Sequence, residues 1–169
     1  DGIRLAAAGR ERQHAQLVLR PRTELGGIRI ECSSLRGPDG AMVPSSALRV
    51  REVAYVPVNT PTDGIGTRGL WPDALPWIGE VWKPVRGRNN PLWITINVPP
   101  GLPAGNYVGH VRLSARNWRR DVPLRLHVWV FSLPEKTDLR SGFGISSDNV
   151  RRYHNLTSDE ALPKVWDGY

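Results

Sequence analysis

The sequence has few of the features that mark several common protein classes. It contains one cysteine, Cys32, among 169 residues, which excludes an internal disulfide and a cysteine-based metal cluster. No apolar run approaches the roughly 20 residues that a membrane-spanning helix needs. Residues 1–4 alternate like a strand and do not have the pattern of a signal peptide. These absences favour a globular domain without a membrane partner.

Lysine is scarce, although the chain is strongly basic. The formal net charge is +7, and of the 23 basic residues only Lys83, Lys136 and Lys164 are lysine. The arginines are scattered singly along the expected strands, and the densest pairs are Arg119-Arg120 and Arg151-Arg152. Scattered arginines are typical of guarded edge strands and of covers for apolar surface. We therefore expect a solvated basic surface and no nucleic-acid partner.

Short segments in which apolar and polar residues alternate make up most of the chain. Side chains on a strand project to alternate faces, so each segment predicts a strand with one buried face. The apolar rows are Ala15, Leu17 and Leu19; Ile28, Ile30 and Cys32; Leu92, Ile94, Ile96 and Val98; Tyr107, Gly109, Val111 and Leu113; and Leu124, Leu126, Val128 and Val130. The stretch from Leu48 to Val58 predicts a more buried strand. With 15 prolines and 17 glycines as punctuation, the pattern indicates an all-β fold, an antiparallel β-sandwich.

A long segment at residues 59–90 interrupts this pattern with proline, glycine and tryptophan. Loops of that length in compact domains are usually functional or held against another surface. We expect tryptophan packing and the fixed φ of proline to hold the part around Trp71 in place.

The character of the sequence changes after Pro134. A polar linker leads to a predicted strand at residues 139–145, and residues 146–148 are suited to cap a short helix at 149–154. A strand followed by a helix is typical of an α/β domain. We expect a β-sandwich domain over residues 1–134, and a linker with a first strand–helix unit over residues 135–169.

Four segments resemble, in the same order, the N-terminal β-sandwich of glycoside hydrolase family 123. They are Arg10–Pro21, with its Gln-Leu-Val strand; Gly69–Pro76, which reads GLWPDALP; Asn90–Gly109, which contains PLWITINVP and AGNYVG; and Val122–Pro134, which ends in VWVFSLP. Four ordered blocks are far more specific than any one motif.

The resemblance implies a sandwich followed by a TIM-type barrel, of which this chain would hold only a truncated first βα unit. It implies that the family's first sandwich strand precedes residue 1 and that most of the barrel follows residue 169. Characterised members are similar to hexosaminidases that release β-linked N-acetylgalactosamine by a retaining, substrate-assisted route. The implied parent is a secreted or periplasmic carbohydrate-cleaving enzyme without a cofactor.

In this interpretation the chain is the non-catalytic sandwich that supports the barrel, and carbohydrate binds through the barrel. The alternative from another class is a stand-alone carbohydrate-binding or cell-surface β-sandwich module. A third possibility is a sandwich that binds nucleic acid, which strongly salt-dependent DNA binding would support.

The family's chemistry uses an adjacent aspartate and glutamate, one to orient the substrate acetamide and one to protonate the leaving oxygen. Asp159-Glu160 is the single such dipeptide, but no predicted strand precedes it and Thr157 or Ser158 marks it as a helix start. We therefore expect no catalytic residue in this chain. The residues best placed for substrate contact are Ser146, Ser147 and Asp148, which follow the first predicted barrel strand.

The seven tryptophans include Trp71 in the long loop and Trp93 and Trp129 on outward strand faces. Their rings could stack on sugars, but exposed tryptophan without a partner surface is uncommon. We expect these three residues to pack against the neighbouring domain, with Trp93 and Trp129 on the same face of one sheet. The four histidines have no ligand spacing, so no metal site is expected.

Overall fold

The computed structural model describes residues 2–136, 142 and 144–166, and the chain divides into two compact units, 1–135 and 136–169. The strands are β1 (Ile3–Gly9), β2 (Arg12–Leu19), β3 (Arg29–Cys32), β4 (Leu35–Arg36), β5 (Met42–Val43), β6 (Leu48–Glu52), β7 (Tyr55–Val58), β8 (Gly69–Pro72), β9 (Asn90–Asn97), β10 (Gly105–Ala115) and β11 (Trp118–Ser132). Two 3-10 turns, η1 (Pro38–Gly40) and η2 (Ser45–Ala47), flank β5. All of these elements belong to the first unit.

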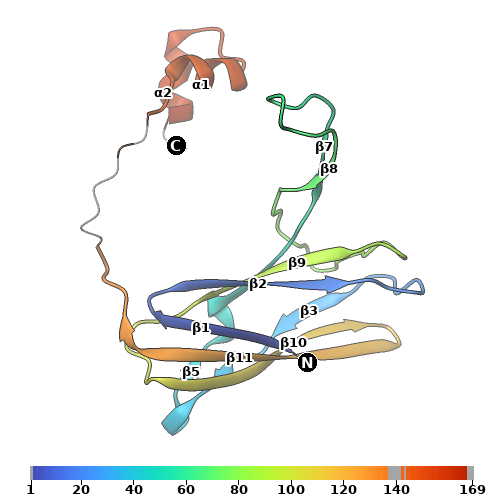
Figure 1. Cartoon of the computed structure of the whole chain (residues 1–169), viewed down its shortest axis with the longest axis vertical. Helices are drawn as coiled ribbons and strands as arrows, with labels where there is room; N and C mark the ends of the chain where they lie inside the picture. Colours follow the sequence, from blue (N-terminus) through green and yellow to red (C-terminus); the bar gives the residue numbers. More distant parts are fainter. Residues whose placement is uncertain (1, 137–141, 143, 167–169) are drawn as a thin grey trace. The chain divides into compact units, whose positions relative to one another are not determined.

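The first unit is built from two stacked sheets (Figure 1). The larger sheet has the order β1-β11-β10-β4-β5, with β3 also paired to β10, and the smaller sheet has the order β2-β9-β6. Neighbouring strands run antiparallel except β1 and β11, which run parallel. The predicted all-β antiparallel sandwich is confirmed.

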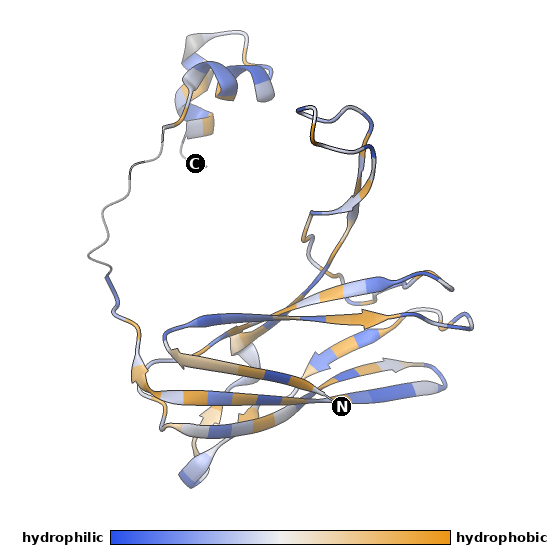
Figure 2. Ribbon diagram, viewed as in Figure 1, coloured by the Kyte–Doolittle hydropathy of each residue, from blue (hydrophilic) through white to orange (hydrophobic). Residues whose placement is uncertain are grey.

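The core lies between the two sheets, where the apolar rows meet. Figure 2 shows the underlying alternation of apolar and polar residues along the strands. The side chains with no exposed surface include Leu92, Ile94 and Ile96 from β9, and Tyr107, Val111, Leu124 and Val128 from β10 and β11. The Tyr107 hydroxyl donates to the Pro103 carbonyl oxygen at 2.8 Å, so its burial does not leave it unpaired. Val130 is 91% exposed, so the predicted inward row of β11 ends at Val128.

The stretch from Leu48 to Val58, predicted as one buried strand, is two strands. β6 pairs with β9 in the smaller sheet, whereas β7 pairs only with β8 in a separate two-stranded ribbon. At the junction the Val53 amide donates to the Pro91 carbonyl and the Ala54 amide donates to the Ala74 carbonyl. The prediction is wrong for β7 because its apolar side chains lie on the ribbon and not between the sheets.

The long segment between β7 and β9 is held to the sandwich by Trp82. This side chain is 3% exposed and belongs to the core, and its backbone exchanges two hydrogen bonds with Ile28 at 2.7 and 2.8 Å. Trp71 is 46% exposed, and its Nε1 donates to the Thr67 carbonyl within the same segment. Tryptophan packing therefore fixes this segment at Trp82, whereas the sequence pointed to the part around Trp71.

The second unit contains α1 (Ser147–Tyr153), η3 (Asp159–Ala161) and α2 (Leu162–Trp166). The Ser146 hydroxyl accepts a hydrogen bond from the Asn149 amide at 3.3 Å, which confirms the predicted cap and helix. Of the predicted strand at 139–145, residues 139–141 and 143 lie outside the described residues, and Gly142, Gly144 and Ile145 are not in a strand.

Replacing Ile94 by alanine should lower the free energy of unfolding by about 2 to 5 kcal/mol, because it opens a cavity in a fully buried row. Val108→Ala is the matched control, since this side chain on β10 is 50% exposed, and should cost less than about 1 kcal/mol. Urea denaturation of the isolated chain measures both. Equal losses would contradict the position of the core.

Candidate functional site

The outer face of the smaller sheet carries a cluster of arginine, aromatic and amide side chains, which we call the arginine face. Its members are Arg12 and His14 from β2, Arg49 and Arg51 from β6, and Trp93, Thr95 and Asn97 from β9. Because β9 is the central strand, the register places Thr95 opposite both His14 and Arg49. Together with Leu75 these residues line a hollow of about 630 Å³.

Hydrogen bonds fix the middle of the arginine face. The Trp93 indole Nε1 donates to Nδ1 of His14 at 3.1 Å, and the Thr95 hydroxyl lies 3.1 Å from the same nitrogen. An indole N–H can only donate, so Nδ1 of His14 acts as the acceptor in this geometry and the ring proton lies on Nε2. Beside them, Nε of Arg12 donates to the Asn97 side-chain oxygen at 2.8 Å. The aromatic and amide groups are thus held in one orientation.

Arg51 connects the arginine face to the long segment that follows β8. Its Nη1 donates to the Leu75 carbonyl at 3.1 Å, and its guanidinium lies 4.1 Å from the ring centroid of Trp77. The guanidinium of Arg49 lies 5.7 Å from the same ring. Such cation–π contacts hold the ring of Trp77, which is 61% exposed, beside the two arginines.

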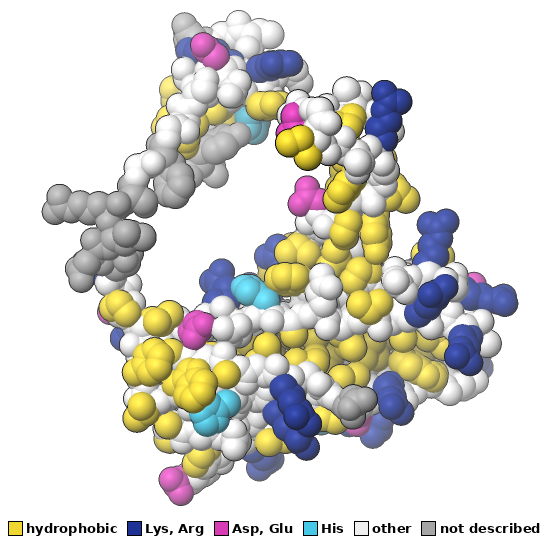
Figure 3. Space-filling view, viewed as in Figure 1, with side chains coloured by type: hydrophobic (Ala, Val, Ile, Leu, Met, Phe, Trp, Pro, Cys, Tyr) yellow, Lys and Arg dark blue, Asp and Glu magenta, His cyan; other side chains and the backbone are white. Residues whose placement is uncertain are grey.

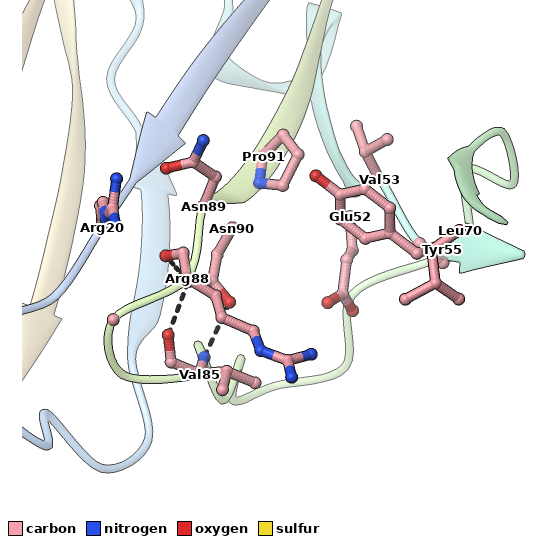
Figure 4. A pocket seen from close by; sticks show the side chains of 12 residues that line it. Arg20, Glu52, Val53, Tyr55, Leu70, Val85, Arg88, Asn89, Asn90 and Pro91 are labelled. Atoms are coloured by element: carbon pink, nitrogen blue, oxygen red, sulfur yellow. Dashed lines mark hydrogen bonds between the residues drawn. The ribbon is translucent and has the colours of Figure 1, made fainter.

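A second hollow, of about 550 Å³, lies at the base of the β7–β8 ribbon (Figure 4). The Asn90 side chain fixes one wall, since its Oδ1 accepts from the Val85 amide and its Nδ2 donates to the carbonyls of Val85 and Arg88. Tyr55 belongs to the opposite wall, and Glu52 is the one carboxylate among the lining residues. A hollow with one carboxylate lacks the pair that glycoside hydrolysis requires.

Apolar side chains gather at the end of β11 in the first unit (Figure 3). Trp129 is 47%, Val130 91%, Phe131 57% and Leu133 40% exposed, and we call these four residues the β11 apolar end. The His127 ring contacts Trp129 edge-on, with ring centroids 4.4 Å apart. Exposed apolar surface of this kind is typical of surfaces that pack against a partner.

Trp93 and Trp129 lie on different sheets, so the predicted shared face is wrong. Trp93 lies in β9 of the smaller sheet and Trp129 in β11 of the larger one. Alternation along a strand correctly assigns each ring to an outer face, but it does not tell which sheet the strand joins. Trp71 lies on neither sheet but on β8 of the ribbon.

The predicted substrate contacts Ser146, Ser147 and Asp148 lie together at the start of α1. Ser146 caps the helix, and the Asp148 carboxylate pairs with Arg151 at 3.1 Å, one turn further along. These contacts give the side chains a local structural use, and substrate contact stays a prediction. Asp159-Glu160 opens η3, as expected of a helix start.

Among the described residues, no group of three or more histidine, cysteine, aspartate or glutamate side chains is placed to hold a metal ion. In the hollow near the ribbon tip, Asp63 and Asp73 are both lining residues. The Asp63 carboxylate already accepts from the amides of Ile65 and Gly66 at 2.9 and 2.8 Å, as in an Asx turn. Its use in the turn favours a structural role.

The arginine face could not be found from the sequence alone. Arg49 and Arg51 are two residues apart on one strand, so the sequence does indicate that they share a face of β6. Arg12 and Asn97 join them only through pairing between strands that are distant in the sequence, and Trp77 joins through the path of the long segment.

On the larger sheet, Asp121 pairs with arginine in an arrangement that is sensitive to pH. Arg112 donates to both of its carboxylate oxygens, at 2.8 and 2.9 Å, and these bonds lower the pKa of Asp121 from 3.8 to about 2. A carboxyl group whose pKa is lowered by folding stabilises the fold above its unfolded pKa, and this contribution is lost as the pH falls.

Asp121→Asn should therefore lower the free energy of unfolding at neutral pH, and the difference from wild type should shrink as the pH falls from about 4 to about 2. Urea denaturation at a series of pH values measures this difference. In an Arg112→Gln background the pH-dependent part should largely disappear. Curves that stay parallel down to pH 2 would contradict the role of this pair.

Comparison with known proteins gives the family. The glycoside hydrolase 123 N-terminal domain matches residues 3–115. Among solved structures, the chain is similar to a family 123 glycoside hydrolase from Clostridium perfringens, described in work on glycolipid glycan hydrolysis, with a TM-score of 0.78 and 14% identity over 94% of this chain and 28% of that chain. It is also similar, with a TM-score of 0.41 and 13% identity, to the CooA pilin subunit from enterotoxigenic Escherichia coli, over 79% of this chain and 92% of that chain.

No curated protein matches the sequence. The likeness to the Clostridium perfringens enzyme shows a common fold, and this chain spans 28% of that enzyme's length. The helices in the described part of the chain do not combine the length and apolar character that a membrane span requires. The family match covers most of the sandwich and includes the first three of the four segments that resemble the family in sequence. The chain belongs to the glycoside hydrolase 123 N-terminal domain family.

Proposed function

We propose that this chain is the non-catalytic N-terminal sandwich of a carbohydrate-cleaving enzyme, and that it supports a TIM-type barrel that carries the active site. The family match supports the proposal, as does the likeness to an enzyme of which this chain spans 28%. That enzyme acts in glycolipid glycan hydrolysis, which supports a glycan substrate here. By the family resemblance we propose a hexosaminide substrate and a secreted or periplasmic enzyme that binds carbohydrate through the barrel.

The observation that carries this proposal is that the buried core of the sandwich is apolar and, among the described residues, contains no acidic side chain. Its inner faces are filled by apolar side chains, which leaves no internal cleft for a sugar among the described residues. Retaining hydrolysis needs an acid and a second carboxyl group that converge on one anomeric carbon. The bidentate contact with Arg112 lowers the pKa of Asp121, whereas a general acid at neutral pH needs a raised pKa.

The β11 apolar end supports the proposal that a following domain packs against this part of the sandwich. These residues immediately precede, along the chain, the boundary between the two units at residue 135. Trp129 and Phe131 are large side chains of the kind that dominate interface cores. We propose that the following domain covers the β11 apolar end and that Trp71 on the ribbon also packs against it. Trp93 has hydrogen-bonded polar neighbours instead, which favours another role.

The isolated 169-residue chain should not hydrolyse an aryl β-N-acetylgalactosaminide, whereas the polypeptide extended through the downstream domain should. The physical reason is that the acid and its partner must be held within about half an ångström of the productive geometry, which requires a closed pocket. Release of the aryl alcohol is measured for both proteins. Activity in the short chain that is lost in Asp159→Asn or Glu160→Gln would contradict the proposal.

The β11 apolar end should bind an apolar dye such as bis-ANS in the isolated chain and be inaccessible to it in the extended polypeptide. Trp129→Ser combined with Phe131→Ser should remove most of the dye fluorescence, because the contiguous apolar surface is lost. Val18→Ser combined with Met42→Ser is the matched control, since these side chains are 49% and 50% exposed but lie on different sheets. Equal dye binding by the short and extended proteins would argue against coverage.

A further inference from the structure

We propose that the arginine face binds an acidic saccharide, one that carries a sulfate or a carboxylate group. The choice of a saccharide rests on the proposed function, whereas the requirement for negative charge rests on the geometry of the face alone. The site would be an accessory binding site on the sandwich, separate from any active site in the barrel.

Three guanidinium groups line the hollow of the arginine face, and among the described residues none of them forms a salt bridge with a carboxylate. Nε of Arg12 donates a hydrogen bond to the side-chain oxygen of Asn97, and Nη1 of Arg51 donates one to the carbonyl oxygen of Leu75. Both terminal nitrogens of Arg12, Nε and Nη2 of Arg51, and the whole guanidinium of Arg49 have no hydrogen bond within the described part of the chain. The hollow is therefore lined by charged guanidinium groups whose remaining N–H donors have no acceptor among the described residues.

Two arginines of the larger sheet offer a contrast, because both lie beside a carboxylate. Arg112 and Arg119 both contact Asp121, which neutralises part of their charge. The lining of the arginine face includes no aspartate or glutamate. Three like charges around one hollow repel one another, and a bound anion would relieve that repulsion. Sulfate and carboxylate groups also match the two-pronged donor geometry of a guanidinium.

The dimensions of the arginine face suit a short oligosaccharide. Arg12 and Arg49 lie on the two outer strands of a three-stranded sheet and are offset by two residues along the strands, which places their backbones about 12 Å apart. His14 and Thr95 lie in the same row as Arg49, Trp93 lies in the next row beside Arg51, and hydrogen bonds already join His14 to Thr95 and to Trp93. A ligand therefore meets side chains whose orientation is fixed in advance, which lowers the entropy lost on binding. The ring of Trp93 and the polar groups beside it match the mixed C–H and hydroxyl surface of a sugar.

A single-stranded nucleic acid is a weaker match to the same surface. Such ligands need an extended basic groove with aromatic faces free for successive bases. Here the Trp77 ring lies against the guanidinium of Arg51, so Trp93 has no row of free aromatic faces beside it on which successive bases could stack. The charges surround one hollow and do not follow a track.

Isothermal titration of the 169-residue chain tests the proposal with four probes. They are a heparin-derived tetrasaccharide, which carries sulfate and carboxylate; a hyaluronan tetrasaccharide, which carries carboxylate only; neutral cellotetraose; and the oligonucleotide (dT)8. We expect binding of one or both acidic saccharides and none of cellotetraose, and the two acidic probes separate sulfate from carboxylate. (dT)8 should bind at least about tenfold more weakly than the better acidic saccharide.

Arg49→Gln combined with Arg51→Gln should weaken binding of the acidic saccharide at least about tenfold, because two charged donors are lost. The matched control is Arg4→Gln combined with Arg125→Gln. This double variant removes the same charge from two exposed residues that lie side by side on β1 and β11 of the larger sheet. That control should change the affinity less than about threefold. Arg12→Gln provides a second test and should also weaken binding, and because Arg12 makes no hydrogen bond to Leu75, this loss would not come from a displaced long segment. Melting curves check that every variant is folded.

Three results would overturn the proposal: no binding of either acidic saccharide, equal binding of cellotetraose or (dT)8, or an equal loss in the Arg4 and Arg125 control. Each would leave the proposed role of the sandwich intact, because hydrolysis by the extended polypeptide is measured separately. Conversely, saccharide binding by a chain whose extended form is inactive would favour a stand-alone binding module.

Discussion

The structure of the first unit depends on the burial of one face of the smaller sheet against one face of the larger one. The central strand of the smaller sheet, β9, contributes Leu92, Ile94 and Ile96, all without exposed surface. β10 and β11 contribute the opposing rows, and Trp82 from the long segment joins the same core. Burial of large apolar side chains is worth roughly 1.5 to 3 kcal/mol each. No helix is needed to cover either inner face.

Alternation along the strands then leaves the two outer faces with separate properties. The larger sheet pairs Arg112 and Arg119 with Asp121 and ends in exposed apolar residues beyond Val128. The smaller sheet holds a fixed aromatic and amide centre among arginines that have no carboxylate partner among the described residues. One face therefore favours an apolar partner and the other an anionic one. A single sandwich can serve both because neither outer face contributes to the core.

Local patterns in the sequence predict much of this fold. Parity identified the buried rows of β9, β10 and β11, and the serine before α1 identified the helix start. Parity did not identify the break at Val53–Ala54, because a strand that leaves a sheet keeps the same composition as one that stays. It also did not reveal that Trp93 and Trp129 belong to different sheets. The arginine face escaped prediction for the same reason, since it is assembled by pairing between β2, β9 and β6.

The parallel pairing of β1 with β11 has a consequence for how the chain folds during synthesis. Ile3 lies beside Leu124, so the first strand of the larger sheet acquires its neighbour only after some 120 further residues have been made. Among the described strands, β11 is the one that pairs with β1, and an unpaired strand edge is a template for pairing with another chain. Contacts between such distant residues also form slowly because a long loop must close first. The smaller sheet, whose last strand β9 ends at Asn97, is complete earlier in translation than the sheet that must cover it. The apolar rows of the smaller sheet are therefore complete before the rows of β10 and β11 that cover them have been synthesised.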